Sequence, residues 1–326
     1  MTQTTINAIQ IEAPGGPDAM KLVEVALPAP TSDQVTVRLA ACGINLIDTY
    51  HRSGLYPLSM PARLGCEGAG IVEAVGPEVS SLKVGDRVAF AMASGAYAEA
   101  INLPATALVA VPEGVELEAA AAILLKAMTV DYLFNDTFPL SGGEQVLFHA
   151  AAGGVGLIAS QWAKHLGVDL IGTASTAAKC ELAKQHGATE CLLSGDDDLA
   201  EQLRNIAPEG FPVVYDSVGK DSYRLSLGAL APLGTFVSFG NASGAIDAVV
   251  PGELALGGSL YFTRPTLATH MMRPGWMQQS AARIFELMGK GVLSVEINQR
   301  FALSEATAAH EALEARKTTG SSLLLP

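Results

Sequence analysis

Two hydrophobic patterns follow each other along this chain and predict two kinds of structure. Between about residues 8 and 111, short apolar runs such as 35–40, 70–75 and 85–90 alternate with turns rich in Gly and Pro. Runs of this length, bounded by turn residues, are typical of β-strands. They predict a compact, barrel-like β domain, followed by a helix over about residues 118–134.

From residue 141 to 264 the pattern changes, and strand-like runs alternate with helix-like ones. The predicted strands are 146–148, 168–173, 191–193, 213–216 and 235–239, and the predicted helices are 155–166, 180–186, 199–206 and 223–230. Regular alternation of this kind is typical of βαβ units. It predicts an α/β fold with a doubly wound parallel sheet.

After Pro274 the pattern predicts a helix to about Met288, a strand over 295–301, a helix to about Ala315 and a final strand over 322–325. Ser304 is a residue type that can N-cap the second of these helices. We expect this tail to return to the first domain.

The turn at residues 148–156 is the most informative motif, because a predicted strand precedes it and a predicted helix follows it. Ala151, Gly153 and Gly156 match the dinucleotide-binding fingerprint, with Ala in the first position. Gly153 allows close approach of a pyrophosphate, and Gly156 allows the helix to pack closely on the strand. The free amides and the helix dipole then face the phosphates. The alternative is a turn of small residues that only packs.

The end of the next strand indicates which dinucleotide is bound. NAD-binding domains usually place an acidic residue there to bind the ribose hydroxyls, whereas this chain has Ser175, Thr176 and Lys179. A carboxylate would repel a ribose phosphate, and Lys179 would attract it. We therefore predict NADPH rather than NADH. The alternative is that Lys179 is an ordinary solvated charge.

Composition agrees with a two-domain cytosolic enzyme. The 326 residues exceed one ordinary core, and 49% are apolar against 16% charged. The net charge of −13 disfavours nucleic acid and anionic membranes as partners. No signal peptide is evident in residues 1–5, and the longest aliphatic run, 119–125, is too short to span a bilayer.

Several long segments resemble the zinc-independent quinone oxidoreductases of the medium-chain dehydrogenase/reductase superfamily, over nearly the whole chain. These segments are residues 43–50, 52–56, 147–158, 214–219, 237–241, 263–265 and 320–324. The resemblance implies a GroES-like catalytic domain (1–127 and 265–326) and a Rossmann nucleotide-binding domain (128–264). It also implies an active cleft between the domains and a homodimer joined through the nucleotide domain. The aliphatic and aromatic residues within 258–262 predict an exposed edge strand of that domain, at which the two copies would pair.

The resemblance also implies roles for individual residues. The residues that would line the substrate site are Asn45, Asp48, Tyr50, Tyr56, Thr129 and Tyr132. The residues that would bind NADPH are Ala152, Gly153, Gly154, Val155, Gly156, Gly172, Thr173, Ser175, Thr176, Lys179, Ser217, Phe239, Gly240, Asn241, Thr263, Arg264, Pro265 and Arg316. An alternative for Tyr50 and Tyr56 is that they only pack, half-buried, without touching substrate. An alternative for Asp48 is that its side chain only caps the local backbone. His149 is predicted to be a strand-end residue with a satisfied imidazole.

No metal is predicted. Zinc-dependent relatives supply a thiolate and an imidazole where this chain has Asn45 and Cys66. Asn is a poor zinc ligand, and we interpret Cys66 as an isolated thiol and a small core residue. The four cysteines are scattered along the sequence, which favours reduced thiols, although spacing alone leaves open a site assembled across the fold.

Without a metal to stabilise an alkoxide, alcohol chemistry is disfavoured, and three functions stay open. The first is NADPH-dependent quinone reduction, and the second is reduction of an enone or alkenal double bond. The third is a non-catalytic NADPH-binding protein similar to some crystallins. Two departures from the family pattern bear on details: Ser194 stands in place of a Tyr near the adenosine phosphate, and Asp131 in place of an aromatic residue.

Overall fold

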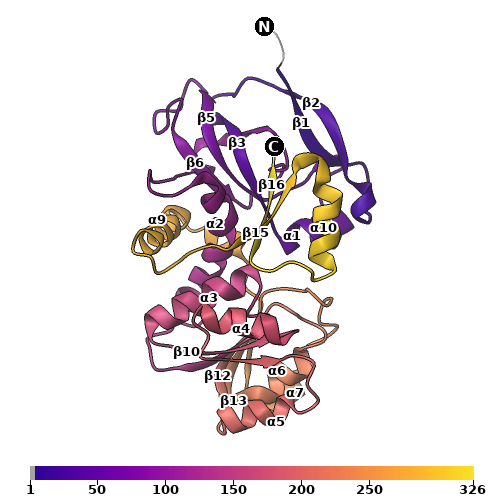
Figure 1. Cartoon of the computed structure of the whole chain (residues 1–326), viewed down its shortest axis with the longest axis vertical. Helices are drawn as coiled ribbons and strands as arrows, with labels where there is room; N and C mark the ends of the chain where they lie inside the picture. The colour runs from indigo at the N-terminus through magenta and orange to yellow at the C-terminus, as the bar shows by residue number, and fades with distance from the viewer. Residues whose placement is uncertain (1–3) are drawn as a thin grey trace. The chain divides into compact units, whose positions relative to one another are not determined.

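The computed structural model describes residues 4–326, and the chain divides into two compact units (Figure 1). Unit 1 holds the chain up to Lys126, Met277–Gly291 and Val295–Pro326, and unit 2 holds Ala127–Trp276 and Val292–Ser294. The prediction that no signal peptide begins the chain falls partly on Met1, Thr2 and Gln3, which lie outside the described residues.

Unit 1, from residue 4 onward, is built on two sheets. The larger has the order β15-β16-β3-β5-β6-β8, with β7 also paired to β3, and the smaller has the order β2-β1-β4. Their bounds are β1 Thr4–Ile11, β2 Lys21–Leu27, β3 Gln34–Ile44, β4 Ala62–Arg63, β5 Glu67–Val75, β6 Arg87–Ala91, β7 Ala100–Pro104, β8 Val109–Ala110, β15 Ile297–Ala302 and β16 Ser321–Leu325. The predicted barrel-like β domain is confirmed.

The end of the chain belongs to the same sheet as the N-terminal strands. β16 pairs antiparallel with β3, with Leu323 opposite Gly43 and Leu324 opposite Cys42. The sheets are accompanied by the helices α1 (Leu46–Ser53), α9 (Trp276–Gly289, in this unit from Met277) and α10 (Ala306–Glu314). Short 3₁₀ turns lie at Pro17–Ala19, Ala105–Ala107 and Leu303–Glu305.

Unit 2 is a six-stranded parallel sheet with the order β11-β10-β9-β12-β13-β14. The strands are β9 Gln145–Phe148, β10 Asp169–Ala174, β11 Glu190–Leu193, β12 Phe211–Asp216, β13 Leu230–Ser238 and β14 Tyr261–Thr263. The order of the strands reverses between β9 and β12, which is the arrangement of a dinucleotide-binding domain. The predicted doubly wound sheet is confirmed.

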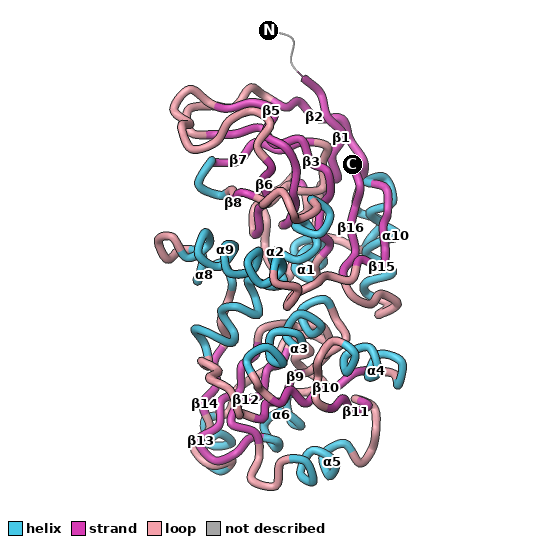
Figure 2. Tube along the Cα trace, turned by 60° about the vertical axis from the view of Figure 1, so that its left-hand side comes forward, coloured by secondary structure: helices cyan, strands magenta, loops and turns pink. Residues whose placement is uncertain are grey.

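Helices cover both faces of this sheet. Figure 2 shows α3 (Gly154–Leu166) and α4 (Ala177–Gln185) on one face, with α5 (Leu199–Ile206) and α6 (Tyr223–Ala229) on the other. The short helices α7 (Pro251–Leu256) and α8 (Leu267–Met271) flank β14 in the sequence. Apolar side chains of the helices, such as Leu157 and Leu203, and of the strands, such as Val214 and Phe236, are buried in unit 2.

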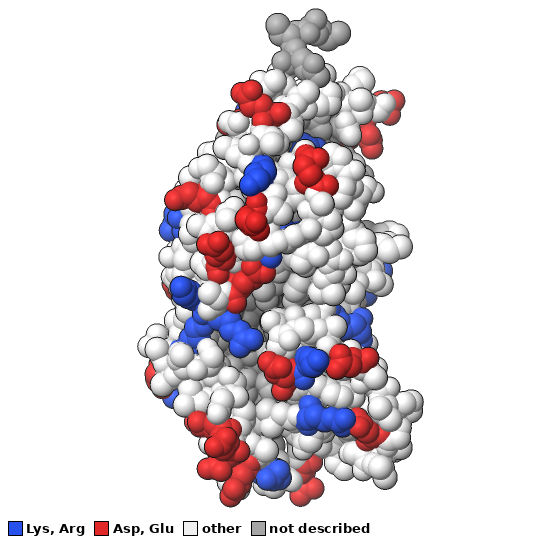
Figure 3. Space-filling view, turned by 90° about the vertical axis from the view of Figure 1, so that its right-hand side faces the viewer, with Lys and Arg blue, Asp and Glu red and all other residues white. Residues whose placement is uncertain are grey.

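The long helix α2 (Leu117–Tyr132) continues into one π-helical turn, Leu133–Thr137. Its residues up to Lys126 belong to unit 1 and those from Ala127 to unit 2. Within residues 4–326, no helix is both long and apolar enough to cross a membrane. Figure 3 shows one face of the molecule, on which acidic and basic side chains are interspersed with wide uncharged areas.

Two local predictions are wrong. Ser304 does not cap α10, because it lies inside the 3₁₀ turn that precedes this helix. Instead, the Glu305 carboxylate accepts the backbone N–H of Ala302 at 2.8 Å. The predicted edge strand at 258–262 begins later, at Tyr261, because Gly258 and Ser259 adopt positive φ in a turn. β14 is nevertheless an edge strand, as predicted.

Candidate functional site

In unit 2, the predicted cofactor residues gather at the carboxyl ends of the parallel strands. Residues 149–156 follow β9, Ser175 and Thr176 follow β10, Ser217 follows β12, and residues 239–241 follow β13. Since all six strands run in one direction, these loops share one edge of the sheet. Ligands of open α/β sheets bind at this edge, next to the point where the strand order reverses.

The glycine turn has the backbone that the fingerprint requires. Gly153 occupies the N-cap of α3 in an extended conformation, and the helix begins at Gly154. A Cβ atom at Gly156 would lie 2.5 Å from the carbonyl oxygen of Ala151, which no side chain tolerates. Gly156 is therefore needed for the close approach of helix and strand, as predicted. The first amides of α3 are left to meet an anion.

The end of β10 separates buried from accessible groups. Thr173 is 1% exposed, and its hydroxyl bonds Nδ1 of His149 at 2.9 Å. A Cβ atom at Gly172 would lie 2.6 Å from that of Ala151. Gly172 and Thr173 therefore pack beneath the glycine turn and support it. Ser175 and Thr176 are exposed, and the Thr176 hydroxyl caps α4 by accepting the backbone N–H of Lys179 at 3.3 Å.

A buried polar network ties the three central strands together below the glycine turn. His149 lies between Thr173 and Ser226, whose hydroxyl is 3.0 Å from Nε2. Burial lowers the pKa of His149, which keeps the ring neutral. Ser226 donates to Asp216, whose other oxygen accepts the amides of Val218 and Gly219. The prediction of a satisfied His149 imidazole is confirmed, and the network orients the loop that contains Ser217.

The loops after β12 and β13 pack closely on each other. A Cβ atom at Gly240 would lie 2.5 Å from the carbonyl oxygen of Ser217, and the Ala242 amide donates to the same oxygen at 3.1 Å. The guanidinium of Arg264 donates to the carbonyl oxygen of Ser238 at 3.1 Å. The structure thus brings Ser217, Phe239–Asn241 and Thr263–Pro265 to one side of the sheet.

The part of α2 in unit 2 contains Thr129 and Tyr132, which are 8% and 2% exposed. The Tyr132 ring stacks on His270 with centroids 4.6 Å apart. His270 in turn lies 3.2 Å from Asp136, which also accepts from the indole of Trp276. Tyr132 is therefore one wall of an aromatic and acidic cluster that the sequence pattern did not indicate.

In unit 1, the four remaining predicted substrate residues lie on α1 and the loop after it. Asn45 is the N-cap of α1, and the Asp48 carboxylate accepts the Asn45 backbone N–H at 2.8 Å. Asp48 therefore caps the helix locally, which is the role given above as the alternative to lining the substrate site. Tyr50 and Tyr56 are half-buried and pack edge to face, with centroids 5.3 Å apart.

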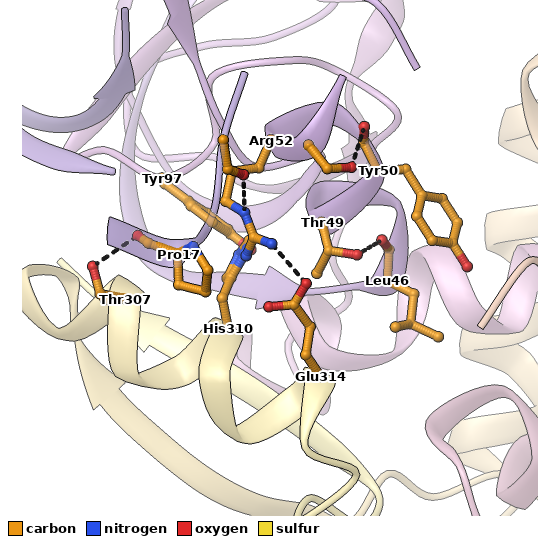
Figure 4. A network of polar contacts seen from close by, with 11 residues as sticks. Pro17, Leu46, Thr49, Tyr50, Arg52, Tyr97, Thr307, His310 and Glu314 are labelled. Carbon is orange, nitrogen blue, oxygen red and sulfur yellow. Dashed lines mark hydrogen bonds and ion pairs between the residues drawn. The ribbon is translucent and has the colours of Figure 1, made fainter. Parts of the chain in front are cut away.

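Asp48 receives a directed chain of hydrogen bonds from α10. Arg52 donates to Nδ1 of His310 at 3.0 Å (Figure 4), so the Nε2–H of His310 can donate to the Tyr97 oxygen at 3.1 Å. The Tyr97 hydroxyl then donates to Asp48 at 2.9 Å. Burial raises the pKa of Asp48 to about 6, against the lowering effect of its hydrogen bonds. Burial, with the Arg52 charge, lowers the pKa of His310 to about 3.

The Asn45 side chain contacts a second buried group, the carboxylate of Glu67. Asn45 Nδ2 donates to Glu67 Oε2 at 2.9 Å, and the ammonium of Lys126 lies 3.1 Å from the same oxygen. The backbone N–H of Leu125 donates to Oε1 at 2.7 Å. Glu67 and Lys126 are 0% and 5% exposed.

The interpretation of Cys66 as an isolated thiol is wrong, because Asp48 and His51 each place a possible ligand atom within 4.8 Å of it. The prediction that it is buried is confirmed, with an exposed fraction of 1%. Burial and the Asp48 charge raise the pKa of the thiol well above its usual range, whereas zinc needs a thiolate. One Asp48 oxygen already accepts Asn45 and Tyr97. The other Asp48 oxygen has no hydrogen-bond partner, so the absence of zinc stays a prediction that rests on Asn45, a poor zinc ligand.

Arg316 lies in unit 1, in the loop between α10 and β16, and has a positive φ of 55°. Ser175 and Lys179, its predicted companions at the adenosine phosphate, lie in unit 2. Its contribution to cofactor binding stays a prediction.

The sequence pattern did not indicate Glu67, Lys126, Tyr97 and His310 as members of the site. Only Lys126 carried a signal, since it is a single charge directly after the aliphatic run of α2. The others are brought together by tertiary contacts between distant segments, such as Arg52 and His310, which are 258 residues apart.

Comparison with known families matches two consecutive models. Residues 31–113 match the alcohol dehydrogenase GroES-like domain, and residues 154–288 match the zinc-binding dehydrogenase model. The first match lies in unit 1 and most of the second in unit 2.

Relatives match over the full length. A quinone oxidoreductase of Pseudomonas aeruginosa is 51% identical over 98% of this chain and 99% of its own. The crystal structure of Escherichia coli quinone oxidoreductase complexed with NADPH superposes with a TM-score of 0.96, at 44% identity over 99% of this chain and 100% of that one. A 2-haloacrylate reductase of Burkholderia is 40% identical over 98% of this chain and 99% of its own.

Proposed function

Because the chain belongs to the quinone oxidoreductase family of the medium-chain dehydrogenase/reductase superfamily, we propose that it is an NADPH-dependent quinone oxidoreductase. The observation that carries this proposal is a complete dinucleotide-binding edge in unit 2 in a chain 51% identical to a named quinone oxidoreductase. The crystal structure of a relative with bound NADPH supports the cofactor.

The residues of unit 2 fit this cofactor. Two glycines, Gly156 and Gly240, stand where a Cβ atom would collide with backbone at 2.5 Å, so the loops can form a close-fitting phosphate cradle. Residues 152–156 would bind the pyrophosphate through amides at the N-terminus of α3. Ser175, Thr176, Lys179 and Arg316 would meet the adenosine phosphate, because hydroxyls and cations suit that anion. Ser217, residues 239–241 and residues 263–265 would hold the nicotinamide end.

When bound, NADPH supplies the hydride, and the chain's own residues position the acceptor. The edge-to-face pair of Tyr50 and Tyr56 offers aromatic surface with polar tips, which suits a planar quinone. Asn45, Asp48, Thr129 and Tyr132 complete the set of residues that we propose to line the substrate site. Solvent supplies the proton. A quinone needs no Lewis acid, because its conjugated carbonyl system accepts the electrons of the hydride.

Steady-state oxidation of NADPH against a panel of quinones, enones and alkenals tests the proposal. We expect turnover with simple benzoquinones or naphthoquinones to exceed turnover with alkenals. The rival function is reduction of an activated carbon–carbon double bond. The 2-haloacrylate reductase, which is 40% identical to this chain, is the relative that supports this rival. Rapid alkenal reduction without quinone reduction would establish that rival. Cofactor binding without either reaction would favour a non-catalytic NADPH-binding protein.

The proposal extends to organisation and location. We propose a catalytic domain of residues 1–127 and 265–326 and a nucleotide-binding domain of residues 128–264. We also propose a homodimer that pairs through β14, whose residue Tyr261 is 60% exposed at the edge of the sheet. An edge strand with exposed apolar side chains favours association. Four free, buried cysteines support a reducing, cytoplasmic location.

A further inference from the structure

Two of the cysteines lie side by side in unit 2. Cys180 is close to the N-terminus of α4, and Cys191 is on β11, the strand at one edge of the sheet. The Cys191 thiol donates a hydrogen bond to the sulfur of Cys180. The Cys180 thiol in turn donates to the carbonyl oxygen of Leu192 at 3.4 Å. Helix and strand are therefore joined by two thiols in direct contact, the arrangement from which a disulfide can form.

This dithiol lies beside residues predicted to bind the cofactor. Cys191 pairs with Gly172 of β10, and its sulfur lies 3.3 Å from the position of a Cβ atom at Gly172. On the helix, Lys179 directly precedes Cys180, and its backbone N–H donates to the Thr176 hydroxyl at 3.3 Å. The turn of α4 that carries the predicted phosphate-binding residues is thus the turn that holds one of the two thiols.

The two sulfurs have different chemical parts. Burial, together with the hydrogen bond to Cys180, raises the pKa of the Cys191 thiol well above its usual range. Cys191 therefore keeps its proton and directs it at Cys180, so negative charge is better held on Cys180. The thiols are 5% and 7% exposed, which suits a small diffusible oxidant rather than a bulky one. A nucleophilic sulfur beside a second thiol is typical of cysteines that respond to oxidants.

We propose that Cys180 and Cys191 are a redox-responsive dithiol, which a hydroperoxide converts into a disulfide that weakens binding of NADPH. The Cys180 thiolate attacks one oxygen of the peroxide and the O–O bond breaks, which leaves a sulfenic acid on Cys180 and releases an alcohol, or water from hydrogen peroxide. The sulfur of Cys191 then attacks the sulfenic sulfur. The S–S bond forms, and the hydroxyl leaves with the thiol proton as water. Two thiols lose two electrons, and the peroxide gains them.

The disulfide acts on the cofactor site through α4. An S–S bond of about 2.05 Å is shorter than any contact between two thiols, so its formation draws the N-terminal turn of α4 toward β11. The inference rests on the proposed function, which places Ser175, Thr176 and Lys179 at the adenosine phosphate. Because the Thr176 hydroxyl caps the same turn, these three residues move with Cys180. NADH lacks that phosphate, so its binding is not affected.

The test compares reduced and oxidised wild type. Hydrogen peroxide is added in small excess, peptide mass spectrometry locates the disulfide, and fluorescence titration gives the dissociation constants for NADPH and NADH. We expect a bond between Cys180 and Cys191 and a loss of NADPH affinity on the order of tenfold, the value of one charge-assisted hydrogen bond. NADH affinity stays unchanged. Dithiothreitol restores NADPH binding, which separates the disulfide from oxidised methionine.

Three variants identify the sulfurs. Cys180→Ala keeps its NADPH affinity after peroxide treatment. Cys191→Ala stops at the sulfenic acid of Cys180, which dimedone traps. Cys42→Ala removes a buried thiol of unit 1 that donates to the carbonyl oxygen of Ala98, and it responds to peroxide as the wild type does. The wild-type comparison requires no substitution, so it decides the proposal even where a variant does not fold.

The proposal is overturned if the folded protein forms no bond between Cys180 and Cys191. It is also overturned if the bond forms and NADPH affinity is unchanged, or if affinity for NADPH and NADH falls equally. Circular dichroism of the oxidised protein identifies unfolding, which would appear as such an equal loss. Failure of the reduced wild type to bind NADPH would contradict the proposed function instead, so the two failures are distinguishable.

Discussion

Arg52 on α1 and His310 on α10 are joined by a buried hydrogen bond of 3.0 Å, across 258 residues of sequence. Arg52 also donates to the Glu314 carboxylate at 2.6 Å and to the carbonyl oxygen of Gly15 at 3.1 Å. The helix that holds Tyr50 is thus anchored to the C-terminal part of unit 1. A neutral His310 is required, because Nδ1 accepts from a cation.

This bond predicts acid sensitivity. Folding lowers the pKa of His310 to about 3 from an ordinary value near 6.5, so the unfolded chain takes up a proton that the folded protein does not. The free energy of unfolding therefore falls as the pH drops from about 6.5 toward 3. Asp48 acts in the opposite direction, because its raised pKa of about 6 favours protonation in the folded protein.

His310→Gln isolates the histidine contribution, since Gln can accept from Arg52 and donate to Tyr97 without titrating. We expect its free energy of unfolding to fall less steeply with decreasing pH, by up to about 1.4 kcal/mol per pH unit. Urea denaturation at several pH values between neutral and mildly acidic measures this. His165→Gln, at an exposed histidine, serves as the control. Parallel curves for His310→Gln and wild type would contradict the prediction.

Tyr56→Phe tests positioning of the acceptor. The Tyr50–Tyr56 ring pair survives the loss of one hydroxyl, so the stacking surface remains. We expect a higher KM for quinone and a smaller change in kcat, as for a residue that binds the substrate. Steady-state kinetics with one quinone measures both. A large loss of kcat at unchanged KM would assign Tyr56 to the chemical step instead.

Lys179→Ala tests how the cofactor is selected. Losing a charge-assisted hydrogen bond to a phosphate should weaken NADPH binding by about 1 to 3 kcal/mol and leave NADH nearly unchanged. Titration of both cofactors checks this, with the exposed Lys164→Ala on α3 as the matched control. Equal losses for NADPH and NADH would show that Lys179 does not recognise the phosphate. Ser194, in place of the family Tyr, could limit the preference that remains.

Activity should survive chelators, because Asn45 stands where zinc-dependent relatives supply a ligand and turns its Nδ2 toward Glu67, and an Asn side chain is a poor zinc ligand. Turnover before and after dialysis against EDTA, together with elemental analysis, checks this. Stoichiometric zinc whose removal abolishes turnover would be incompatible with the prediction.

The proposed dimer predicts a light-scattering mass of twice the chain mass at micromolar concentration. Tyr261 on the edge strand β14 is 60% exposed, and Leu256 at the end of the preceding helix α7 is 91% exposed. Tyr261→Asp/Leu256→Asp should therefore shift the mass toward one chain. Val84→Asp, at a residue 61% exposed in unit 1, should leave the mass unchanged. A wild-type mass of one chain would refute the dimer.

Hydrophobic patterns and turn residues were sufficient to predict the elements of unit 2 and its cofactor edge. Local patterns suffice there: Gln145–Phe148, Gly154–Leu166 and Asp169–Ala174 form the predicted βαβ unit. Parallel strands place all their carboxyl ends at one edge. The residue types after those strands therefore already indicate an anion site.

The pairing of buried polar groups, by contrast, depends on how distant segments pack in the folded chain. Glu67 and Lys126, like Tyr97 and His310, are far apart in the sequence, and no local pattern identifies the partner of a buried charge. Ser304 failed as a cap because the chain enters α10 through a 3₁₀ turn. Cys66 gained Asp48 and His51 as neighbours because the chain just before β5 packs against α1. Such partners depend on packing between segments, whereas hydrophobic periodicity reports only which face of a segment is buried.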